Sequence, residues 1–570
     1  MTRSMPAQSK TLPDTASPNS KALGAYYTDS KVADFLAVWA VRQRSDTVMD
    51  PCFGGGVFLR AARRRLTELR GNVSAQLFGV EVDAQVHRTM TPQLIHDGIT
   101  SACLVRADFF SINPDAGRMV DAIIGNPPYI RYQRFSGAAR TVALRRSDAQ
   151  GVALPELCSS WAPFLVHCIA MVRKGGRLAM VLPMELTHAK YARPVLAHLQ
   201  RSFGKVTFIT FKEKLFPDLN EDTLLLLAEE RGGKNGTFTL RALENSNQLN
   251  EVFDGLQRPH SRATVVDADS LATGGSRFIE YLLPPLAKRL YNDLKMSSSA
   301  VRLGDLAELG IGYVTGANQF FHLSPADARD RNLPVEFLKP AVRRGRAFSG
   351  LTFSKADWHE AAENGEASFL LHIPAGRAIP AAVKKYVAWG ESQGIPASYK
   401  CRSRSPWYCV PHVHKADAFV SYMSGASPRL VVNKASSYSS NSLHVLRVRP
   451  LVQTSPEMLA VLWLTSLSRL SAEIEGHALG GGMLKLEPSE AKNVLLPTVE
   501  ACEKGRLTEL AVELDGLVRV GRINDAQTIA DEAILERILG FSRKDCGLLR
   551  SAIDALRSRR GYMEGANGAA

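Results

Sequence analysis

The segment from Asp121 to Ile130 places a polar amide and an aromatic ring directly after a short apolar run; it reads Asp-Ala-Ile-Ile-Gly-Asn-Pro-Pro-Tyr-Ile. Two consecutive prolines cannot continue a β-ladder, so we expect a rigid turn after a strand. Such a turn presents the Asn126 side chain and the Pro127 carbonyl as two fixed hydrogen-bond acceptors, with the flat ring of Tyr129 beside them. Two acceptors can hold both hydrogens of an exocyclic amine and direct its lone pair at an electrophile, without a metal or a strong base. A purely structural turn is the alternative interpretation.

A glycine-rich turn upstream could hold a ligand of another kind. Asp50 is followed by Pro-Cys-Phe and three glycines, which include Gly54 and Gly56, and then by an arginine-rich stretch of helical character over residues 61–70. Glycines at a strand-to-helix turn let a ligand approach the backbone closely, near the N-terminus of the helix. A glycine-rich turn without a ligand would have the same sequence.

Two further acids follow the next apolar runs. Glu81, twenty-odd residues after the glycines, can accept hydrogen bonds from both hydroxyls of a ribose. Asp108 comes after the following run, where it can accept from an adenine amine. Each acid alone is more simply a solvated loop carboxylate, but the spaced set predicts a bound adenosine. A nicotinamide-dependent dehydrogenase would fit these acids equally well, and the segment around Asn126 favours a transferase instead.

These residues need a scaffold that brings the ends of several strands together. Short apolar runs alternate with longer stretches of helical character, which predicts a mostly parallel, doubly wound α/β sheet with ligands at the carboxyl ends of its strands. Seven such runs are expected to be strands: Thr47–Asp50, Leu77–Asp83, Cys103–Asp108, Asp121–Gly125, Arg177–Leu182, Val206–Phe211 and Thr223–Ala228.

Length and charge give a broader frame. The 570 residues are too many for one ordinary domain and predict two or three. Lys and Arg number 70 against 56 Asp and Glu, and the formal charge of +14 favours an acidic polymer such as nucleic acid as partner. A basic protein without such a partner is also consistent with this charge.

The remaining composition is typical of a soluble protein. No apolar run approaches the roughly eighteen residues needed to cross a bilayer. Residues 1–22 are rich in Ser, Thr and Pro without the apolar core of a signal peptide, and we expect a disordered tail. The eight cysteines form no CxxC pair, so neither a metal site nor a disulfide framework is predicted, and a reducing cytoplasm is the expected location.

Taken together, the motifs resemble those of N6-adenine DNA methyltransferases, in particular the TaqI-like and type IIG-like group. In that group the cofactor motifs precede Asn-Pro-Pro-Tyr, and a target-recognition domain follows. The resemblance extends over roughly residues 22–497. It implies S-adenosyl-L-methionine as cofactor, double-stranded DNA as partner, and methyl transfer to the exocyclic amine of an adenine flipped out of the duplex.

The resemblance also implies residue roles. The segment Gly24-Ala-Tyr-Tyr-Thr28 resembles the part of the family that helps to hold the methionine end of the cofactor, and Leu215-Phe-Pro217 resembles the part whose ring stacks on the flipped base. The adenine would then lie between two aromatic rings. The implied catalytic residues are Asn126, Pro127, Tyr129 and Phe216, and the implied cofactor-binding residues are Tyr27, Thr28, Asp50, Gly54, Gly56, Glu81, Asp108 and again Asn126.

The expected architecture is α/β: a doubly wound, seven-stranded methyltransferase sheet with a C-terminal mixed α+β target-recognition domain and a helical tail. Segments around Gly310–Asn318 and Gly480–Pro488 resemble parts of the recognition domain of this group. Basic clusters at Arg343–Arg346 and Lys400–Tyr408 suit contacts to phosphates and base edges, although a solvated basic surface has the same composition. The expected domains are a tail (1–22), the methyltransferase domain (23–240), a connector (241–300), the recognition domain (301–498) and a helical segment (499–570).

We find no segment typical of a nuclease, and therefore expect modification only, as part of a restriction-modification or phage-defence system with a separately encoded endonuclease. The glycine turn departs from many relatives at Cys52-Phe53, which is expected to alter packing and not chemistry. Three alternatives share Asn-Pro-Pro-Tyr or the fold. Methyltransferases acting on protein glutamine lack a large downstream domain, an RNA adenine methyltransferase stays open, and a catalytically silent DNA-binding relative would not need the whole set of motif residues.

Overall fold

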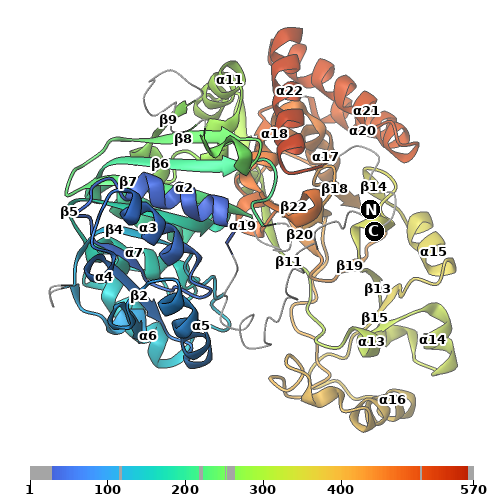
Figure 1. The fold of residues 1–570 in the computed structure, drawn as a ribbon. Helices are drawn as coiled ribbons and strands as arrows, with labels where there is room; N and C mark the ends of the chain where they lie inside the picture. The colour runs from blue at the N-terminus through green and yellow to red at the C-terminus, as the bar shows by residue number, and fades with distance from the viewer. Residues whose placement is uncertain are drawn as a thin grey trace, which may run out of the picture. The chain divides into compact units, whose positions relative to one another are not determined.

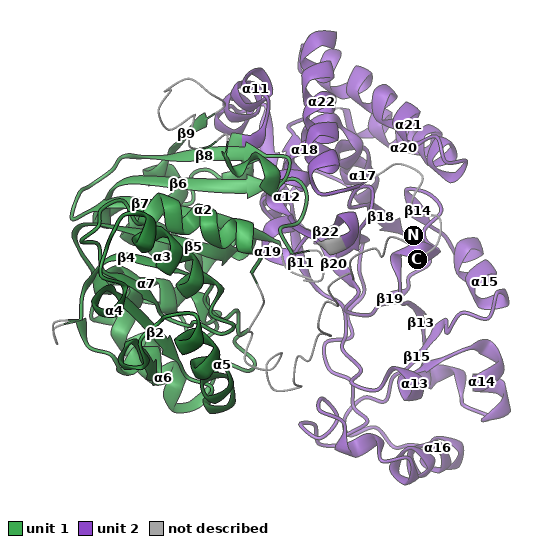
Figure 2. Cartoon of the chain, in the orientation of Figure 1, with its two compact units in different colours: residues 1–281 green, residues 282–570 purple. Residues whose placement is uncertain are grey.

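A computed structural model describes residues 28–114, 118–216, 222–250, 252, 263–500 and 503–562. The chain forms two compact units, residues 1–281 and 282–570 (Figure 2). The tail predicted over residues 1–22 lies outside the described residues. The domain boundaries expected at residues 240, 300 and 498 remain predictions.

Unit 1 is built on one mixed sheet. Its strands are β1 (Val48–Asp50), β2 (Leu77–Glu81), β3 (Leu104–Arg106), β4 (Val120–Gly125), β5 (Val172–Pro183), β6 (Phe203–Phe211), β7 (Thr223–Arg231), β8 (Thr237–Leu243) and β9 (Ala263–Asp267). Among the described residues they lie in the order β3-β2-β1-β4-β5-β7-β6-β8-β9. Figure 1 labels strands β2 and β4 to β9 of this sheet. The five strands from β3 to β5 are parallel, whereas β7 runs antiparallel to both β5 and β6. The carboxyl ends of the parallel strands therefore meet at one edge of the sheet.

This sheet confirms the predicted α/β class and all seven predicted strands, but it is larger than predicted. Strand β8 pairs in parallel with β6 and crosses the predicted domain boundary at residue 240. Strand β9 adds to β8 in antiparallel fashion within the predicted connector. The prediction of seven strands was wrong for two physical reasons. The Gly232-Gly233 pair interrupts the apolar pattern before β8, and β9 is exposed except at Val266, so it carries little apolar signal.

Helices cover both faces of the sheet. Helices α2 (Ser30–Ala40) and α3 (Val57–Glu68) pack on each other and on the central strands, in a cluster that includes Ala179 and Val181 of β5. The β5 side chains on the opposite face of the sheet are also buried. Helix α7 (Trp161–Met171) packs on β5, and helix α8 (Arg193–Ser202) packs on β6. Every residue of α7 is buried, which its uniformly apolar sequence explains. Among the described residues, the remaining α-helices of unit 1 are α4 (Val73–Gln76), α5 (Ala84–His96), α6 (Gly137–Asp148) and α10 (Ala268–Thr273).

Unit 2 contains several small sheets. Its strands are β10 (Ala300–Arg302), β11 (Ala307–Ile311), β12 (His322–Leu323), β13 (Leu338–Val342), β14 (Thr352–Phe353), β15 (Phe369–Leu371), β16 (Ala418–Ser421), β17 (Met423–Ser424), β18 (Leu430–Asn433), β19 (Tyr438–Ser439), β20 (Leu443–Val448), β21 (His477–Leu479), β22 (Met483–Lys485) and β23 (Leu495–Pro497). The described residues give sheets of five, four, three and two strands, in the orders β11-β20-β16-β18-β14, β12-β15-β13-β19, β17-β22-β21 and β10-β23. The mixed α+β character predicted for this part is therefore confirmed.

Two separate apolar clusters stabilise these sheets. One gathers around Phe320, Phe337 and Tyr386, and the other around Phe353 and Phe419. The helices of unit 2 are α11 (Pro285–Met296), α12 (Leu303–Leu306), α13 (Asn318–Phe321), α14 (Pro325–Asp330), α15 (Lys355–Glu363), α16 (Ala381–Ser392), α17 (Pro456–Leu464), α18 (Ser466–Glu475), α19 (Pro488–Ala491), α20 (Lys504–Arg519), α21 (Ile523–Ala530) and α22 (Arg543–Arg559).

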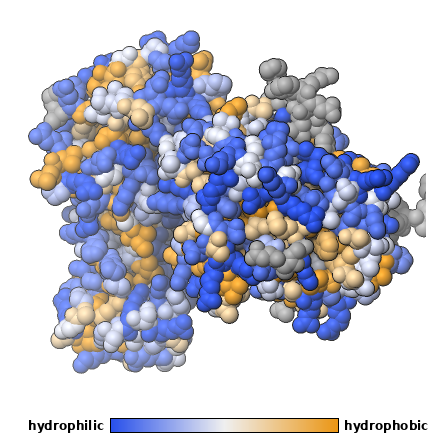
Figure 3. Space-filling model, turned by 90° about the vertical axis from the view of Figure 1, so that its left-hand side faces the viewer, coloured by the Kyte–Doolittle hydropathy of each residue, from blue (hydrophilic) through white to orange (hydrophobic). Residues whose placement is uncertain are grey.

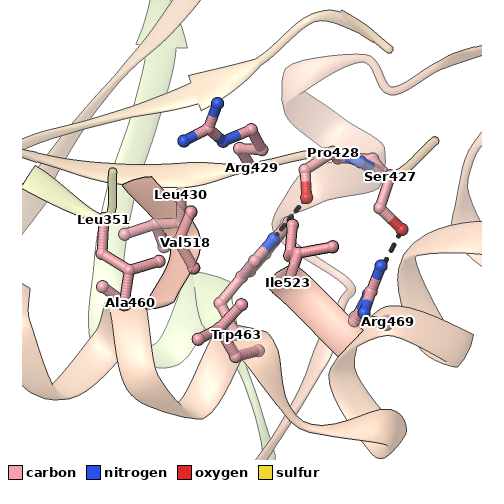
Figure 4. A pocket seen from close by; sticks show the side chains of 11 residues that line it. Leu351, Ser427, Pro428, Arg429, Leu430, Ala460, Trp463, Arg469, Val518 and Ile523 are labelled. Atoms are coloured by element: carbon pink, nitrogen blue, oxygen red, sulfur yellow. Dashed lines mark hydrogen bonds between the residues drawn. The ribbon is translucent and has the colours of Figure 1, made fainter. Parts of the chain in front are cut away.

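The C-terminal helices pack into unit 2. Helix α18 is buried along its whole length and contacts α22, while α20 contacts α17. Glu473 of α18 is almost fully buried and accepts hydrogen bonds from Arg557 (3.4 Å) and Arg560 (3.0 Å). A cavity of about 20 Å³, the size of one water molecule, lies between α17, α20 and β18 (Figure 4). Trp463 donates its Nε1–H to the Pro428 carbonyl at its wall, over 2.8 Å.

We predict that Glu473→Gln destabilises unit 2 by about 3 kcal/mol or more, because removing one partner of a buried ion pair leaves the other charge uncompensated. Chemical denaturation of the full chain measures this, with cofactor binding as the report on unit 1. Glu360→Gln, which changes an exposed carboxylate of α15, is the matched control and should change stability by less than about 0.5 kcal/mol. Equal stability of the two variants would show that the charge pairs at Glu473 contribute nothing.

Candidate active site

Four polar side chains follow the carboxyl ends of neighbouring parallel strands. Asp50 ends β1, Glu81 ends β2, Asp108 lies two residues after β3, and Asn126 follows β4. Because the strands lie in the order β3-β2-β1-β4, these residues form one row along the sheet edge. Ligands of doubly wound sheets bind at this edge. The structure thus brings together four residues that are spread over 77 positions of the sequence, from 50 to 126.

The turn after β1 ties this row together. Gly54 donates its backbone N–H to Glu81 Oε2 over 3.0 Å, and the Cys52 thiol donates to the backbone carbonyl of Asn126 over 3.1 Å. One short turn is therefore bonded to the end of β2 on one side and to the segment after β4 on the other.

Glycine is required at the end of this turn. Gly56 has φ +73° and immediately precedes α3, and a Cβ added there would lie 2.5 Å from a Leu94 methyl carbon. By contrast, a Cβ at Gly54 would have as its nearest neighbour the Cys52 carbonyl oxygen at 3.9 Å, although its φ of +46° still favours glycine. The space beside Gly54 is thus open to a ligand that approaches the backbone.

The carboxylate of Glu81 is held rigidly. Its Oε1 accepts from Asp83 N (2.8 Å), and its Oε2 accepts the Gly54 N–H already described. A carboxylate oxygen can accept more than one hydrogen bond, so both oxygens keep the capacity to receive ligand hydroxyls. Asp108 is oriented in the same manner, because its Oδ1 accepts from Phe110 N (3.0 Å) at the start of a short 3₁₀ turn.

Asp50 is the most buried acid of the row. Its side chain has no exposed surface; Oδ1 accepts one hydrogen bond, from Cys52 N, and Oδ2 has no partner among the described residues. Burial, with a smaller contribution from the charge of Glu81, raises the pKa of Asp50 to about 8. An unsatisfied buried carboxyl oxygen suits a cationic ligand group, such as the ammonium of an amino-acid moiety. The carboxylates of Asp50 and Glu81, with the open space beside Gly54, therefore fit the ammonium and ribose groups of S-adenosylmethionine.

The Asn126 amide is oriented from two sides. Its Nδ2 donates to Thr28 Oγ1 (3.3 Å), and its Oδ1 accepts from the Tyr129 hydroxyl (2.5 Å). Thr28 and Tyr129 are both buried, and Asn126 is half-buried. An amide oxygen has two lone pairs, so Oδ1 can accept an amine hydrogen in addition to the tyrosine hydroxyl.

Ser160 fixes the turn that carries Tyr129, and no local sequence pattern indicated this role. Its Oγ donates to the Pro128 carbonyl (2.5 Å) and accepts from Ile130 N (2.9 Å), while its own N–H donates to the Ile130 carbonyl (2.9 Å). The serine is 2% exposed and directly precedes α7. One residue thus holds the backbone on both sides of the tyrosine.

Two predicted residues are not brought into the row. Phe216 is 8% exposed and belongs to the apolar cluster under α2 and α3, so its stacking role stays a prediction. Tyr27 lies outside the described residues. No cluster of three or more His, Cys, Asp or Glu suited to a metal ion occurs in the described part of the chain.

The predicted basic clusters of unit 2 differ in their surroundings. Arg404 donates to the carbonyls of Val314 (2.6 Å) and Thr315 (2.7 Å), which makes its guanidinium part of the local structure. Arg346 pairs with Glu366. Arg402 is exposed and lies 5.2 Å above the ring of Tyr399.

In the part of the chain that the structure describes, no helix combines the length and apolarity needed to cross a bilayer. Hydrophilic residues dominate the face drawn in Figure 3, and apolar residues form separate patches there.

Two parts of the chain match known protein families. Residues 9–192 match the N-6 DNA methylase family, and residues 275–535 match the C-terminal domain of type II methyltransferase M.Eco57I. The chain is 22% identical to type II methyltransferase M.AccI of Acinetobacter calcoaceticus, over 86% of this chain and 88% of that protein. It is 21% identical to type II methyltransferase M.XamI of Xanthomonas campestris pv. amaranthicola, over 84% and 85% of the two chains.

The fold is also found in a solved structure. The type IIL restriction-modification enzyme MmeI, determined in complex with DNA, superposes with a TM-score of 0.56 at 12% identity, over 93% of this chain and 75% of that one. The fold and the family matches together indicate an S-adenosylmethionine-dependent DNA methyltransferase. The chain is a DNA methyltransferase specific for adenine, and its residues 9–192 carry the match to the N-6 DNA methylase family.

The raised pKa of Asp50 predicts a pH-dependent cost of folding. In the cofactor-free chain Asp50 keeps its proton up to about pH 8, whereas the unfolded chain releases it near its ordinary value of 3.8. Asp50 therefore costs the folded state no free energy below about pH 4, where it is protonated in both states. As the pH rises toward 8 the unfolded state gains by releasing the proton, and the free energy of unfolding falls. Asp50→Asn stays neutral, so its gain in melting temperature over the wild type should grow from pH 5 to pH 8, by about 2–4 °C for each kcal/mol.

Thermal unfolding without cofactor at several pH values measures this gain. The control is Asp148→Asn, which changes an exposed carboxylate at the end of α6 and should show a difference independent of pH. A pH-independent difference for Asp50→Asn as well would mean that the carboxyl is ionised in the folded protein.

Proposed function

We propose that this enzyme is the site-specific modification methyltransferase of a restriction-modification or phage-defence system, and that it methylates an adenine flipped out of duplex DNA at Asn126 and Tyr129. The orientation of the Asn126 amide by Thr28 and Tyr129, in a turn bonded to the Asp50–Gly54 segment, is the observation that carries this proposal. It would place a target amine beside the cofactor pocket.

The residues of the cofactor side would act as fixed acceptors. When bound, S-adenosylmethionine supplies an electrophilic methyl group on its sulfonium sulfur. Asp50 would hold the ammonium of the methionine part, Glu81 would accept from the ribose hydroxyls, and Asp108 would accept from the adenine amine. Gly54 and Gly56 keep the backbone close to the ligand. Thr28 contacts Asn126 in this structure, and with Tyr27 it would border the methionine part.

The target side would act on the amine through acceptors. Asn126 Oδ1 and the Pro127 carbonyl would each accept one amine hydrogen, which draws the nitrogen lone pair out of conjugation with the ring. As the amine becomes positively charged, the two dipoles stabilise it. The proton is then released to solvent after transfer. Tyr129 and Phe216 would stack on the flipped base, returning roughly 1–3 kcal/mol per stacked face against a similar cost of unpairing.

The proposed DNA recognition and the proposed role in a restriction-modification system are supported by relatives. MmeI was determined with DNA, and M.AccI and M.XamI are named type II methyltransferases; we extend duplex DNA recognition to residues 301–498 of this chain. A separately encoded endonuclease would complete the system, and a cytoplasmic location would follow from access to host DNA. RNA is not favoured as substrate, because the curated relatives are named as type II methyltransferases.

We predict that the full chain transfers labelled methyl groups to unmodified duplex DNA, and not to RNA or protein offered in parallel. Methylation should fall on adenine in one short sequence, identified by sequencing DNA from a host that lacks its own adenine methylation. Asn126→Ala should lower turnover at least about 100-fold, because one amine acceptor is lost, while cofactor affinity by calorimetry stays within about twofold. Substantial turnover by this variant would remove the proposed role of the amide.

Ser160 should act as a positioning residue for Tyr129. We predict that Ser160→Ala lowers kcat about 10–100-fold, since a small displacement of a reacting group has effects of that size, with little change in cofactor affinity. Ser160→Thr keeps a hydroxyl and should recover part of the loss. Ser147→Ala, which removes an equally buried hydroxyl bonded only within α6 (Ala143 O, 3.2 Å), is the matched control. If it lowers kcat as much as Ser160→Ala, the effect is general loss of stability.

A further inference from the structure

A groove of about 260 Å³ opens on unit 2 beside the edge strand of its five-stranded sheet. Strands β11 and β20 form its floor, and the loop before β16 and the end of α19 form its sides. All of its lining residues belong to unit 2. Those that carry the argument are Glu308, Gly310, His412, Arg447, Arg449 and Lys492.

The groove carries an excess of positive charge. Arg447, Arg449 and Lys492 line the groove together with one carboxylate, Glu308, which lies 3.4 Å from Arg447 and 4.0 Å from Arg449. Arg449 also donates its Nε–H to the Gly304 carbonyl over 3.2 Å, which leaves the other nitrogens of its guanidinium for a ligand. Arg447 and Glu308 are also direct partners in the ladder between β20 and β11, so their proximity is fixed by the strand register. One carboxylate cannot neutralise three cations, and the lining therefore favours a ligand with negative charge.

Two histidines extend this lining with further hydrogen-bonding groups. The rings of His412 and His414 lie 6.2 Å apart, and both residues are exposed. His412 has φ +58°, a left-handed conformation that is costly for a residue with a side chain. Strained residues persist where the surrounding structure holds them and are concentrated at functional sites.

The floor is open to a bulky ligand. A Cβ added at Gly310 would meet no atom within 4 Å, so packing does not require glycine there. The neighbouring Ile311 is 58% exposed. The absence of a side chain at Gly310 therefore leaves room on the floor of the groove beside Glu308 and Arg447.

We propose that this groove binds the phosphate backbone of duplex DNA next to the recognition site. The proposal rests on the proposed function, which makes duplex DNA the substrate. Phosphodiesters are singly charged, tetrahedral and closely spaced, and three cations within one groove match one or two successive phosphates. The contact would be independent of base sequence and would set affinity and register, leaving the choice of site to other residues.

The test is the salt dependence of binding to a fluorescent, non-specific 30-base-pair duplex by the full chain. Arg447→Gln/Lys492→Gln should weaken binding roughly 10–100-fold at moderate salt and reduce the slope of log K against log salt by about 1–2, because one or two phosphate contacts are lost. The control Lys355→Gln/Arg543→Gln removes two exposed cations of α15 and α22 and should leave the slope unchanged.

Thermal unfolding and cofactor binding must be unchanged in the Arg447→Gln/Lys492→Gln variant. A second variant, Arg449→Gln alone, should also weaken duplex binding and reduce the salt slope, by smaller amounts. A groove variant that binds the duplex with wild-type affinity and slope overturns the proposal while leaving the proposed function intact. Equal affinity of the wild type for polyglutamate, lost in the same variant, overturns DNA as the occupant. Failure of the wild type to methylate any DNA would instead refute the proposed function, and the binding data would still decide on the groove.

Discussion

A carboxyl group without exposed surface lies at the end of the first strand, and the surrounding site depends on its position. Asp50 has one oxygen without a hydrogen-bond partner among the described residues, a condition that normally costs free energy. The neighbouring strand must also approach it closely, since a Cβ at Gly125 would lie 3.3 Å from Asp50 Oδ1. A residue without a side chain is therefore favoured at the end of β4, and the next residue is the amide that we assign to the target. The cofactor acid and the target amide are thus placed by one steric constraint.

The turn after Asp50 converts this placement into a coupled unit. Its hydrogen bonds to Glu81 and to the backbone of Asn126 mean that neither end of the row can move without disturbing the glycines between them. A methyl donor and an acceptor must be aligned to within a fraction of an ångström for transfer. A rigid frame of backbone bonds meets this need better than mobile side chains would. Ser160 adds the same kind of restraint on the far side of Tyr129.

Sequence patterns predicted the features that leave a local mark. Asp50, Glu81, Asp108 and Asn126 each follow an apolar run, and strand order alone brings them together. Ser160 could not be found in this way, because it is thirty positions from the turn that it holds and its segment has no distinctive pattern. The basic segment around Arg404 shows the opposite limit. Its composition suits nucleic acid, yet that guanidinium is engaged by two backbone carbonyls, and composition does not distinguish a structural arginine from a free one. Strand β9 was missed because exposure removes the apolar signal on which strand prediction depends.

Two of the apolar clusters in the described part of unit 2 bear on how such a chain changes over generations. The cluster around Phe320, Phe337 and Tyr386 and the cluster around Phe353 and Phe419 are separate groups of buried side chains. A substitution that loosens the packing of one cluster should therefore destabilise mainly that cluster, because strain in well-packed interiors passes through direct contacts. A lineage can accumulate or exchange residues around the first cluster while the second keeps its packing. Residues around one cluster can thus change while those around the other stay the same within a single polypeptide. Separate cores allow this without a second copy of the gene.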